Sequence, residues 1–155
     1  MKKLFALLAA LTLVSAVSAQ EDYKYGLGLR LSYGADIDFR MNLDQKHTVN
    51  LMLNFPHFNG TVLTGLFEWR WPVIQSGFSA YVGPGLHFGA FGFANDHTAF
   101  NFGIDLMLGL EYKFDAPVAL SIDWKPAMEI LTGDYWARWQ SWGLYNFGLT
   151  IRYCF

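Results

Sequence analysis

Strict alternation of apolar and polar side chains is the property that most restricts the fold of this chain. It is clearest in the last eleven residues, YNFGLTIRYCF, which run from Tyr145 to Phe155. The odd-numbered positions there are all apolar or aromatic, and the even-numbered positions are polar or small. Because successive side chains of a β-strand point to opposite faces, this segment is predicted to be a strand with one apolar and one polar face.

Seven earlier segments repeat the pattern. They cover residues 24–33, 36–43, 48–55, 63–71, 78–88, 100–114 and 118–125. Turn-forming residues separate them, and the longest break runs from about Ala127 to Gln140. Eight strands with no helix between them predict an antiparallel up-and-down meander. Since an even number of antiparallel strands can close without a free edge, we expect an all-β, eight-stranded antiparallel transmembrane β-barrel.

Composition indicates which face of the strands points inward. Hydrophobic residues make up 53% of the chain and charged residues only 15%, where about 25% is typical of soluble proteins. After Ala19 no apolar stretch approaches the ~20 residues that a membrane helix requires. Rows of Leu, Ile and Phe, with Tyr and Trp near the strand ends, suit lipid and its aromatic girdles. We therefore expect the apolar face to meet lipid. The alternative is a soluble lipocalin-like carrier, whose apolar face points inward.

The first 19 residues, MKKLFALLAALTLVSAVSA, have the pattern of a secretory signal peptide. Two lysines precede an apolar run from Leu4 to Val14, and small residues lead to a cleavage site after Ala19. Residues 20–155 then form the mature barrel. Without Lys2 and Lys3, nine of the 11 bases remain against 13 acids, which argues against a nucleic-acid partner. A single cysteine, Cys154, cannot form an internal disulfide.

The signal peptide, the eight alternating strands and the terminal RYCF together resemble the small outer-membrane β-barrel family (porin-like, opacity-type) of bacteria with two membranes. The resemblance implies that the protein lies in the cell outer membrane, with outer-membrane lipids as its surroundings. It also implies that Tyr153 and Phe155 act as a signal read by the barrel-assembly machinery. The architecture hosts anchors, adhesins, enzymes and narrow pores, so the resemblance is specific for class and weak for activity.

Charged residues on the polar face are expected to line the lumen. They are Arg30, Asp36, Asp38, Arg40, Glu68, Arg70, Asp105, Glu111, Lys113, Asp123, Lys125, Glu129 and Arg152. Eight strands enclose an interior just wide enough to be filled by side chains. Because unpaired buried charge is unfavourable, we expect a plug of ion pairs and hydrogen bonds. The alternative is a wet, narrow pore, in which balanced charge would give little ion selectivity.

No catalytic or metal-binding pattern is evident in the sequence. Ser79 and His87 share a face but lie roughly 26 Å apart at ~3.3 Å per residue, too far for a nucleophile and its base. His87 beside an acid such as Asp105 is expected to be a structural contact. No His, Cys or carboxylate pair has metal-ligand spacing on a shared loop. The sequence therefore predicts no enzyme and no cofactor, and a lipid-modifying barrel enzyme is the least favoured alternative.

The segment from Ala127 to Trp142 is the long connection and the candidate for partner binding. Its residues Tyr135, Trp136, Arg138 and Trp139 could form a stacking surface for a sugar or a protein. The preferred interpretation is that these aromatic residues extend the last two strands and cover the barrel mouth. A surface barrel that binds an unidentified ligand through this loop is the second hypothesis for function.

Deletion of Phe155 is expected to lower the amount of assembled barrel, because the resemblance makes this residue part of the assembly signal. The measurement is the heat-modifiable folded band in the outer-membrane fraction. A Phe155→Tyr variant keeps an aromatic terminus and serves as the control. Normal assembly of the deletion variant would contradict the targeting role.

Overall fold

The structure, a computed structural model, describes residues 23–56, 60–72, 77–92, 98–132, 135–138 and 144–155. The predicted signal peptide, residues 1–19, lies outside this part of the chain. The strands are β1 (Tyr25–Leu31), β2 (Gly34–Asn42), β3 (His47–Pro56), β4 (Gly60–Pro72), β5 (Phe78–Gly92), β6 (Thr98–Lys113), β7 (Val118–Trp124), β8 (Ala127–Thr132), β9 (Tyr135–Arg138) and β10 (Phe147–Cys154). No helix among the described residues is long and apolar enough to cross a membrane.

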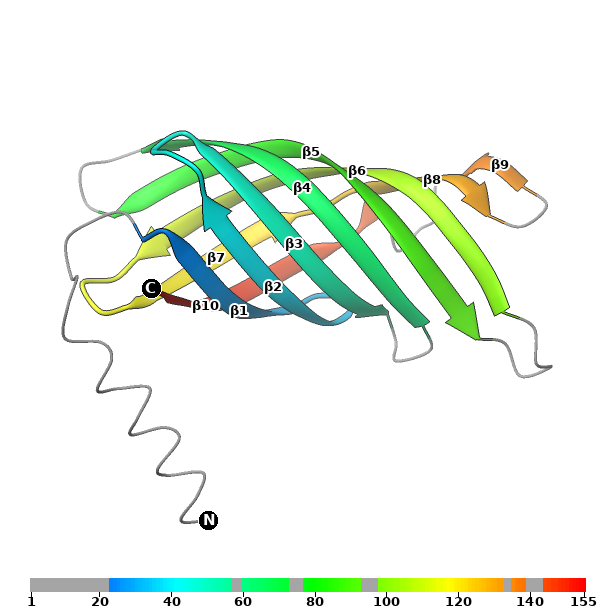
Figure 1. Cartoon of the computed structure of the whole chain (residues 1–155), viewed down its shortest axis with the longest axis horizontal. Helices are drawn as coiled ribbons and strands as arrows, with labels where there is room; N and C mark the ends of the chain where they lie inside the picture. The colour runs from blue at the N-terminus through cyan, green and yellow to red at the C-terminus, as the bar shows by residue number, and fades with distance from the viewer. Residues whose placement is uncertain (1–22, 57–59, 73–76, 93–97, 133–134, 139–143) are drawn as a thin grey trace, which may run out of the picture.

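The strands close into an eight-stranded antiparallel barrel in meander order (Figure 1). Each strand from β1 to β7 pairs with the next, β10 pairs with β7, and β1 pairs with β10 to close the wall. The backbone N–H groups of Tyr25 and Phe155 each donate to the other's carbonyl at 2.8 Å. Both ends of the barrel chain therefore meet at one end of the barrel, here called the terminal end. The opposite end, which carries the β1–β2 turn, is called the distal end.

The seventh barrel strand continues past the point where the sequence predicted its end. After a break at Lys125 and Pro126, β8 follows β6 in the same alignment, with Asp105 opposite Ala127 as Leu108 is opposite Trp124. Proline has no N–H to donate, yet the Pro126 carbonyl still accepts from the N–H of Leu106 at 2.9 Å. β9 then pairs back on β8, so the expected break after Ala127 is strand over most of its described length.

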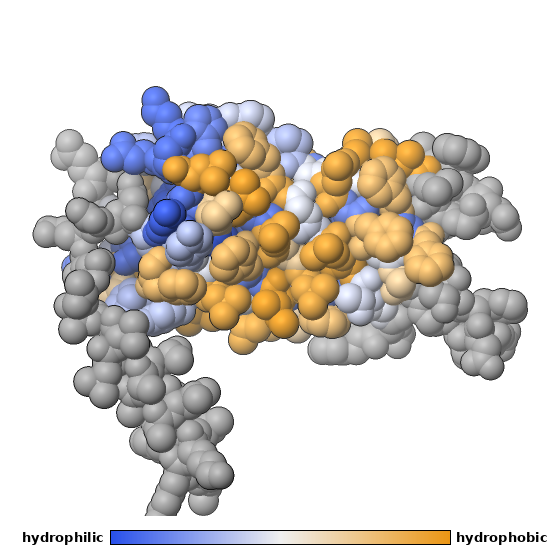
Figure 2. All heavy atoms as spheres, viewed as in Figure 1, coloured by the Kyte–Doolittle hydropathy of each residue, from blue (hydrophilic) through white to orange (hydrophobic). Residues whose placement is uncertain are grey.

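Apolar side chains cover the outside of the barrel and polar side chains fill the inside. In β10, exposed and buried positions alternate, with Phe147 61% exposed and Arg152 1% exposed. Leu29 and Ile122, on other strands, are each 59% exposed. Figure 2 shows hydrophobic residues over the middle of the visible wall and hydrophilic residues at the terminal end. The two faces therefore have the polarity opposite to that of a water-soluble protein.

Aromatic side chains gather on the outer wall at the terminal end. The ring of Tyr25 lies 6.3 Å from that of Phe39 and 6.0 Å from that of Phe155, which in turn lies 6.1 Å from the ring of Tyr153. These residues come from three neighbouring strands and the C-terminal residue, so cross-strand pairing brings them together. The two residues of the predicted assembly signal thus lie at the seam where the barrel closes.

Gly83 is required where β5 passes close to β4. A Cβ atom at this position would overlap the Phe67 carbonyl and lie 2.6 Å from the Cα of Glu68. Both are backbone neighbours that cannot rotate away. At Gly65, on the outer face of β4, the nearest atom to such a Cβ is Cδ2 of Leu51 at 3.7 Å.

Gly83→Ala is therefore expected to lower the free energy of unfolding by about 1–3 kcal/mol through overpacking. Gly65→Ala, the matched control, is expected to change it by less than ~0.5 kcal/mol. Urea unfolding of the two variants in detergent micelles, followed by tryptophan fluorescence, measures the difference. Equal stability of the two variants would show that β4 and β5 are not this close.

Candidate functional site

Charged pairs fill the barrel interior. Twelve of the thirteen residues predicted to line the lumen are buried: Arg30, Asp36, Asp38, Arg40, Glu68, Arg70, Asp105, Glu111, Asp123, Lys125, Glu129 and Arg152. Lys113 differs from this group because β6 ends there. Its ammonium donates to the carbonyls of Phe114 and Ala116 at 2.8 Å each, so it caps the turn at the terminal end.

The first group of lumenal charges surrounds Glu111 and is named the Glu111 cluster. It consists of Tyr23, Asp38, Arg40, Glu68, Arg70, Glu111 and Arg152. The Glu111 carboxylate accepts from the Tyr23 hydroxyl at 2.9 Å and from Arg40 at 2.9 Å. It also pairs with Arg70 at 3.1 Å and contacts Arg152. One carboxylate therefore joins three guanidinium groups from three strands.

The Glu111 cluster is balanced in charge. Arg40 also pairs with Glu68 at 2.8 Å, and Arg152 pairs with Asp38 at 2.6 Å. Three arginines thus face three carboxylates within one buried group. Pairs of this kind offset the desolvation of each ion through close contact with the opposite charge and through hydrogen bonds, such as those that Arg40 and Arg152 donate to Glu111 and Asp38.

The second group is centred on Arg30. Its guanidinium pairs with Asp36 at 2.7 Å and with Asp123 at 2.6 Å, and it donates to the side-chain carbonyl of Asn146 at 3.1 Å. A Cβ atom on Gly148 would overlap this guanidinium, so the glycine leaves room for it. Arg30 therefore links β1, β2, β7 and the residue before β10 through the lumen.

The third group lies around His87 and includes the predicted contact with Asp105. His87 Nδ1 is 2.7 Å from Asp105 Oδ2, and His87 Nε2 is 3.3 Å from Glu129 Oε2. Glu129 also accepts from Asn101 at 2.8 Å. Because Glu129 belongs to β8, these contacts attach the strand extension to β5 and β6. Ser79 accepts from Arg70 instead, at 2.9 Å.

An apolar layer lies inside the lumen, and the sequence reasoning missed it. It consists of Met52, Leu66, Tyr81 and Met107, all nearly inaccessible to solvent. In β4, Leu66 lies between Thr64, which accepts from the Lys125 ammonium at 3.3 Å, and Glu68, which belongs to the Glu111 cluster. The guanidinium of Arg40 lies 4.4 Å from the centre of the Tyr81 ring. The strand parity of Leu66 and Met107 is the sequence signal that places them inside, on the same face as the lumenal charges.

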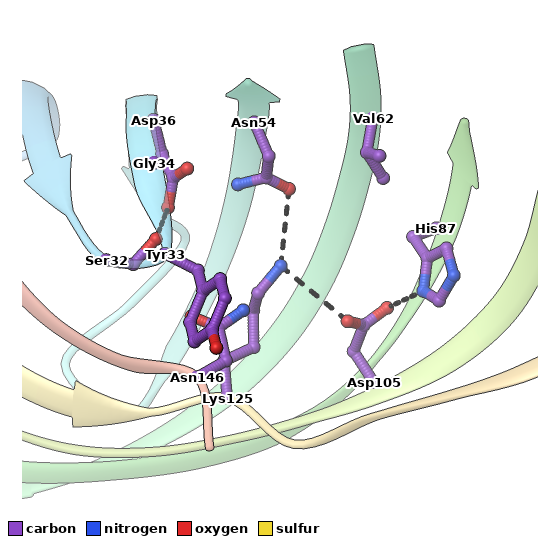
Figure 3. Close-up of a pocket in the computed structure, with 10 residues that line it drawn as sticks. All are labelled: Ser32, Tyr33, Gly34, Asp36, Asn54, Val62, His87, Asp105, Lys125 and Asn146. Atoms are coloured by element: carbon purple, nitrogen blue, oxygen red, sulfur yellow. Dashed lines mark hydrogen bonds and ion pairs between the residues drawn. The ribbon is translucent and has the colours of Figure 1, made fainter. Parts of the chain in front are cut away.

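A small cavity opens at the distal end of the lumen (Figure 3). Its volume is about 20 Å³, and its lining includes Asn54, Asp105, Lys125 and Asn146. Lys125 Nζ donates to Asn54 at 3.2 Å and lies 3.7 Å from Asp105 Oδ1. Among the described residues, no three His, Cys, Asp or Glu side chains are placed to hold a metal ion.

The predicted partner loop is only partly described. Tyr135, Trp136 and Arg138 lie on β9, but their side chains fall outside the described part of the chain, as does the whole of Trp139. The structure therefore establishes a strand extension at the distal end and leaves the stacking surface as a prediction.

Glu111→Gln is expected to lower the free energy of unfolding by about 3–5 kcal/mol, because it removes the charge that compensates three buried arginines. Urea unfolding in micelles measures the change. Asp44→Asn is the control: Asp44 lies in the exposed β2–β3 turn, where a hydrogen bond with His47 lowers the pKa of its carboxyl. An unchanged unfolding midpoint for Glu111→Gln would mean that the three arginines are compensated elsewhere.

The chain was compared with protein-family models, with curated proteins and with solved structures, and it matches none of them. The function is therefore inferred from the barrel and its three buried charge groups.

Proposed function

We propose that this protein is an integral outer-membrane β-barrel of structural type, with a lumen sealed by paired charges and an apolar layer. The observation that carries the proposal is the inverted polarity of the barrel. Leu, Ile or Phe side chains face outward on every barrel strand, as Leu51 does on β3, and arginines and carboxylates face inward. The proposal assigns the protein no catalysis.

The outer wall favours lipid over water as the surrounding medium. Soluble monomers rarely expose contiguous apolar patches larger than a few hundred Å². Here exposed large apolar side chains occur on all eight strands around the barrel wall, from Leu27 on β1 to Ile151 on β10. The closed wall pairs its backbone groups within the sheet, as a chain in hydrocarbon must. A lipocalin-like carrier would instead need an apolar interior, and this interior is filled with ion pairs.

The interior favours a sealed barrel over the porin-like alternative. An open path needs wet, mobile charges, whereas each arginine on the polar face of β1, β2 and β10 is buried against carboxylates at hydrogen-bond distance. The apolar layer adds a barrier without charged groups on the β3–β6 side of the lumen. Ions would have to break pairs in the Glu111 cluster and then cross this layer.

The outer-membrane location rests on the sequence. An export signal precedes the barrel, and Tyr153 and Phe155 close the chain in the manner of an assembly signal. Tyr153 lies on β10, the strand that completes the wall, and Phe155 directly follows this strand and is 56% exposed on the outside. A terminal aromatic residue in this position is accessible to an assembly partner before the β1–β10 seam forms.

The membrane location predicts that carbonate or urea washes leave the protein in the membrane pellet. An integral barrel is held by its whole apolar wall, whereas a peripheral or soluble protein is released by either wash. Immunoblotting of pellet and supernatant, with a periplasmic protein as the released control, measures the partition. Recovery in the supernatant would overturn the proposal in favour of a soluble carrier.

The sealed lumen predicts a silent planar bilayer. The refolded mature chain is expected to give no discrete conductance steps, because the charge groups and the apolar layer close the path. A known open porin, refolded and inserted in the same way, is the positive control. Reproducible steps from correctly folded protein would contradict the seal and support a narrow pore.

A further inference from the structure

The distal cavity has the size of one water-sized group. Its volume of about 20 Å³ exceeds the roughly 10–15 Å³ that a single water needs. It lies between Asn54 and Asp105 on one side and Ser32 and Asn146 on the other (Figure 3). The apolar layer below it blocks passage along β3–β6, so a group that enters from the distal end is bound there rather than conducted.

The charges around the cavity are already neutralised, which disfavours an ion as the occupant. Asp36 pairs with Arg30 at 2.7 Å, and Asp105 pairs with His87 at 2.7 Å. Lys125 is held by Asn54 and Asp105. An added cation or anion would find no free countercharge among these residues, and burying an unpaired ion is unfavourable.

Two residues that line the cavity, Asp105 and His87, each carry a buried polar atom without a hydrogen bond to the described part of the chain, and His87 Nε2 lies 3.3 Å from the Glu129 carboxylate. Asp105 is 5% exposed, and its Oδ1 atom has no hydrogen-bond donor among the described residues, since the Lys125 ammonium is 3.7 Å away. The uncharged polar part of the lining includes the hydroxyl of Ser32 and the side-chain amides of Asn54 and Asn146. A hydroxyl group matches this mixture because it both donates and accepts.

Tyr33 adds an aromatic surface at the rim. It lines the cavity from the β1–β2 turn and is 45% exposed. In Figure 3 its ring lies beside Lys125 and Asn146. A ring of this kind provides a flat apolar face for the C–H groups of a sugar whose hydroxyl enters the cavity.

We propose that the distal cavity is a binding site for a neutral sugar, which inserts one hydroxyl group between Asp105, Asn54 and Asn146 and places its ring against Tyr33. The position of the cavity at the cell surface rests on the proposed outer-membrane function. The binding itself does not, because it depends only on the folded barrel.

The experiment titrates the refolded barrel in detergent micelles with glucose, galactose and mannose. The readout is the NMR signals of the Asn54 and Asn146 side-chain amides. At least one sugar is expected to shift both signals saturably, with a dissociation constant on the order of millimolar, since one hydroxyl and one ring face give weak affinity. Binding only after a glycosylated lipid is added to the micelles would support the same site with a lipid source.

Two variants test the geometry. Val62, 3% exposed, lines the cavity, so Val62→Ile adds a methylene there and is expected to abolish binding. Val82→Ile, on the outer face of β5, is its control. Tyr33→Leu is expected to weaken binding about three- to tenfold by loss of the ring face. Tyr145→Leu, 68% exposed near the same end, is the control and is expected to bind normally.

Several results would overturn the proposal. One is no saturable shift with any sugar, either free or on a glycosylated lipid, which would mean that solvent water alone fills the cavity. The others are equal shifts with acetate or ammonium, and unchanged binding in both Val62→Ile and Tyr33→Leu. A folded barrel that passes the extraction test but binds no sugar would overturn the sugar site and leave the proposed function intact. Sugar binding by a barrel that carbonate or urea washes release from the membrane would overturn the proposed function and leave the sugar site intact.

Discussion

The buried carboxylate of Glu111 is the interaction on which much of the interior depends. It compensates the charges of arginines from β2, β4 and β10 and accepts a hydrogen bond from the hydroxyl of Tyr23, which lies just before β1. Without it, three guanidinium groups would remain in a space that excludes water. A barrel of this width has no room to hydrate them, so the strands around the lumen are held in register by charge pairing.

Charge pairing inside and apolar residues outside are two consequences of one constraint. When every strand alternates, a closed wall must send all residues of one parity to the lumen and all of the other to the exterior. The lumen then has to satisfy arginines and carboxylates mainly with one another, with neutral side chains such as Tyr23 and Asn146 as further partners. The exterior is left without polar groups over most of its height, and lipid is the medium that such a surface suits.

The two ends of the barrel carry different structural features. The terminal end brings the seam, the aromatic cluster with Phe155 and the Glu111 cluster together, all of which serve closure. The distal end carries the β8–β9 extension, attached through Glu129, and a small cavity whose polar groups are nearly but not fully satisfied. The closing seam therefore lies at one end of the barrel and the small cavity at the other.

The sequence by itself determined the strands and the faces, because a period of two fixes which side chains share a side. It also indicated that charges such as Arg30 and Glu111 point inward, and that His87 neighbours an acid. Only the tertiary structure decided which charges pair: Arg152 meets Asp38, 114 residues away, through the curvature of the closed wall.

Three further points depended on the closed wall for the same reason. Lys113 is not part of the lumenal charge groups, because β6 ends at this residue and its ammonium donates to the nearby carbonyls of Phe114 and Ala116. The seventh barrel strand continues beyond Pro126 because β6 lies beside it, and the N–H of Leu106 donates to the Pro126 carbonyl. The apolar layer forms because Met52, Leu66, Tyr81 and Met107 reach one level from four adjacent strands. Alternation gives each side chain a direction, whereas its partners follow from how the strands are staggered around the barrel.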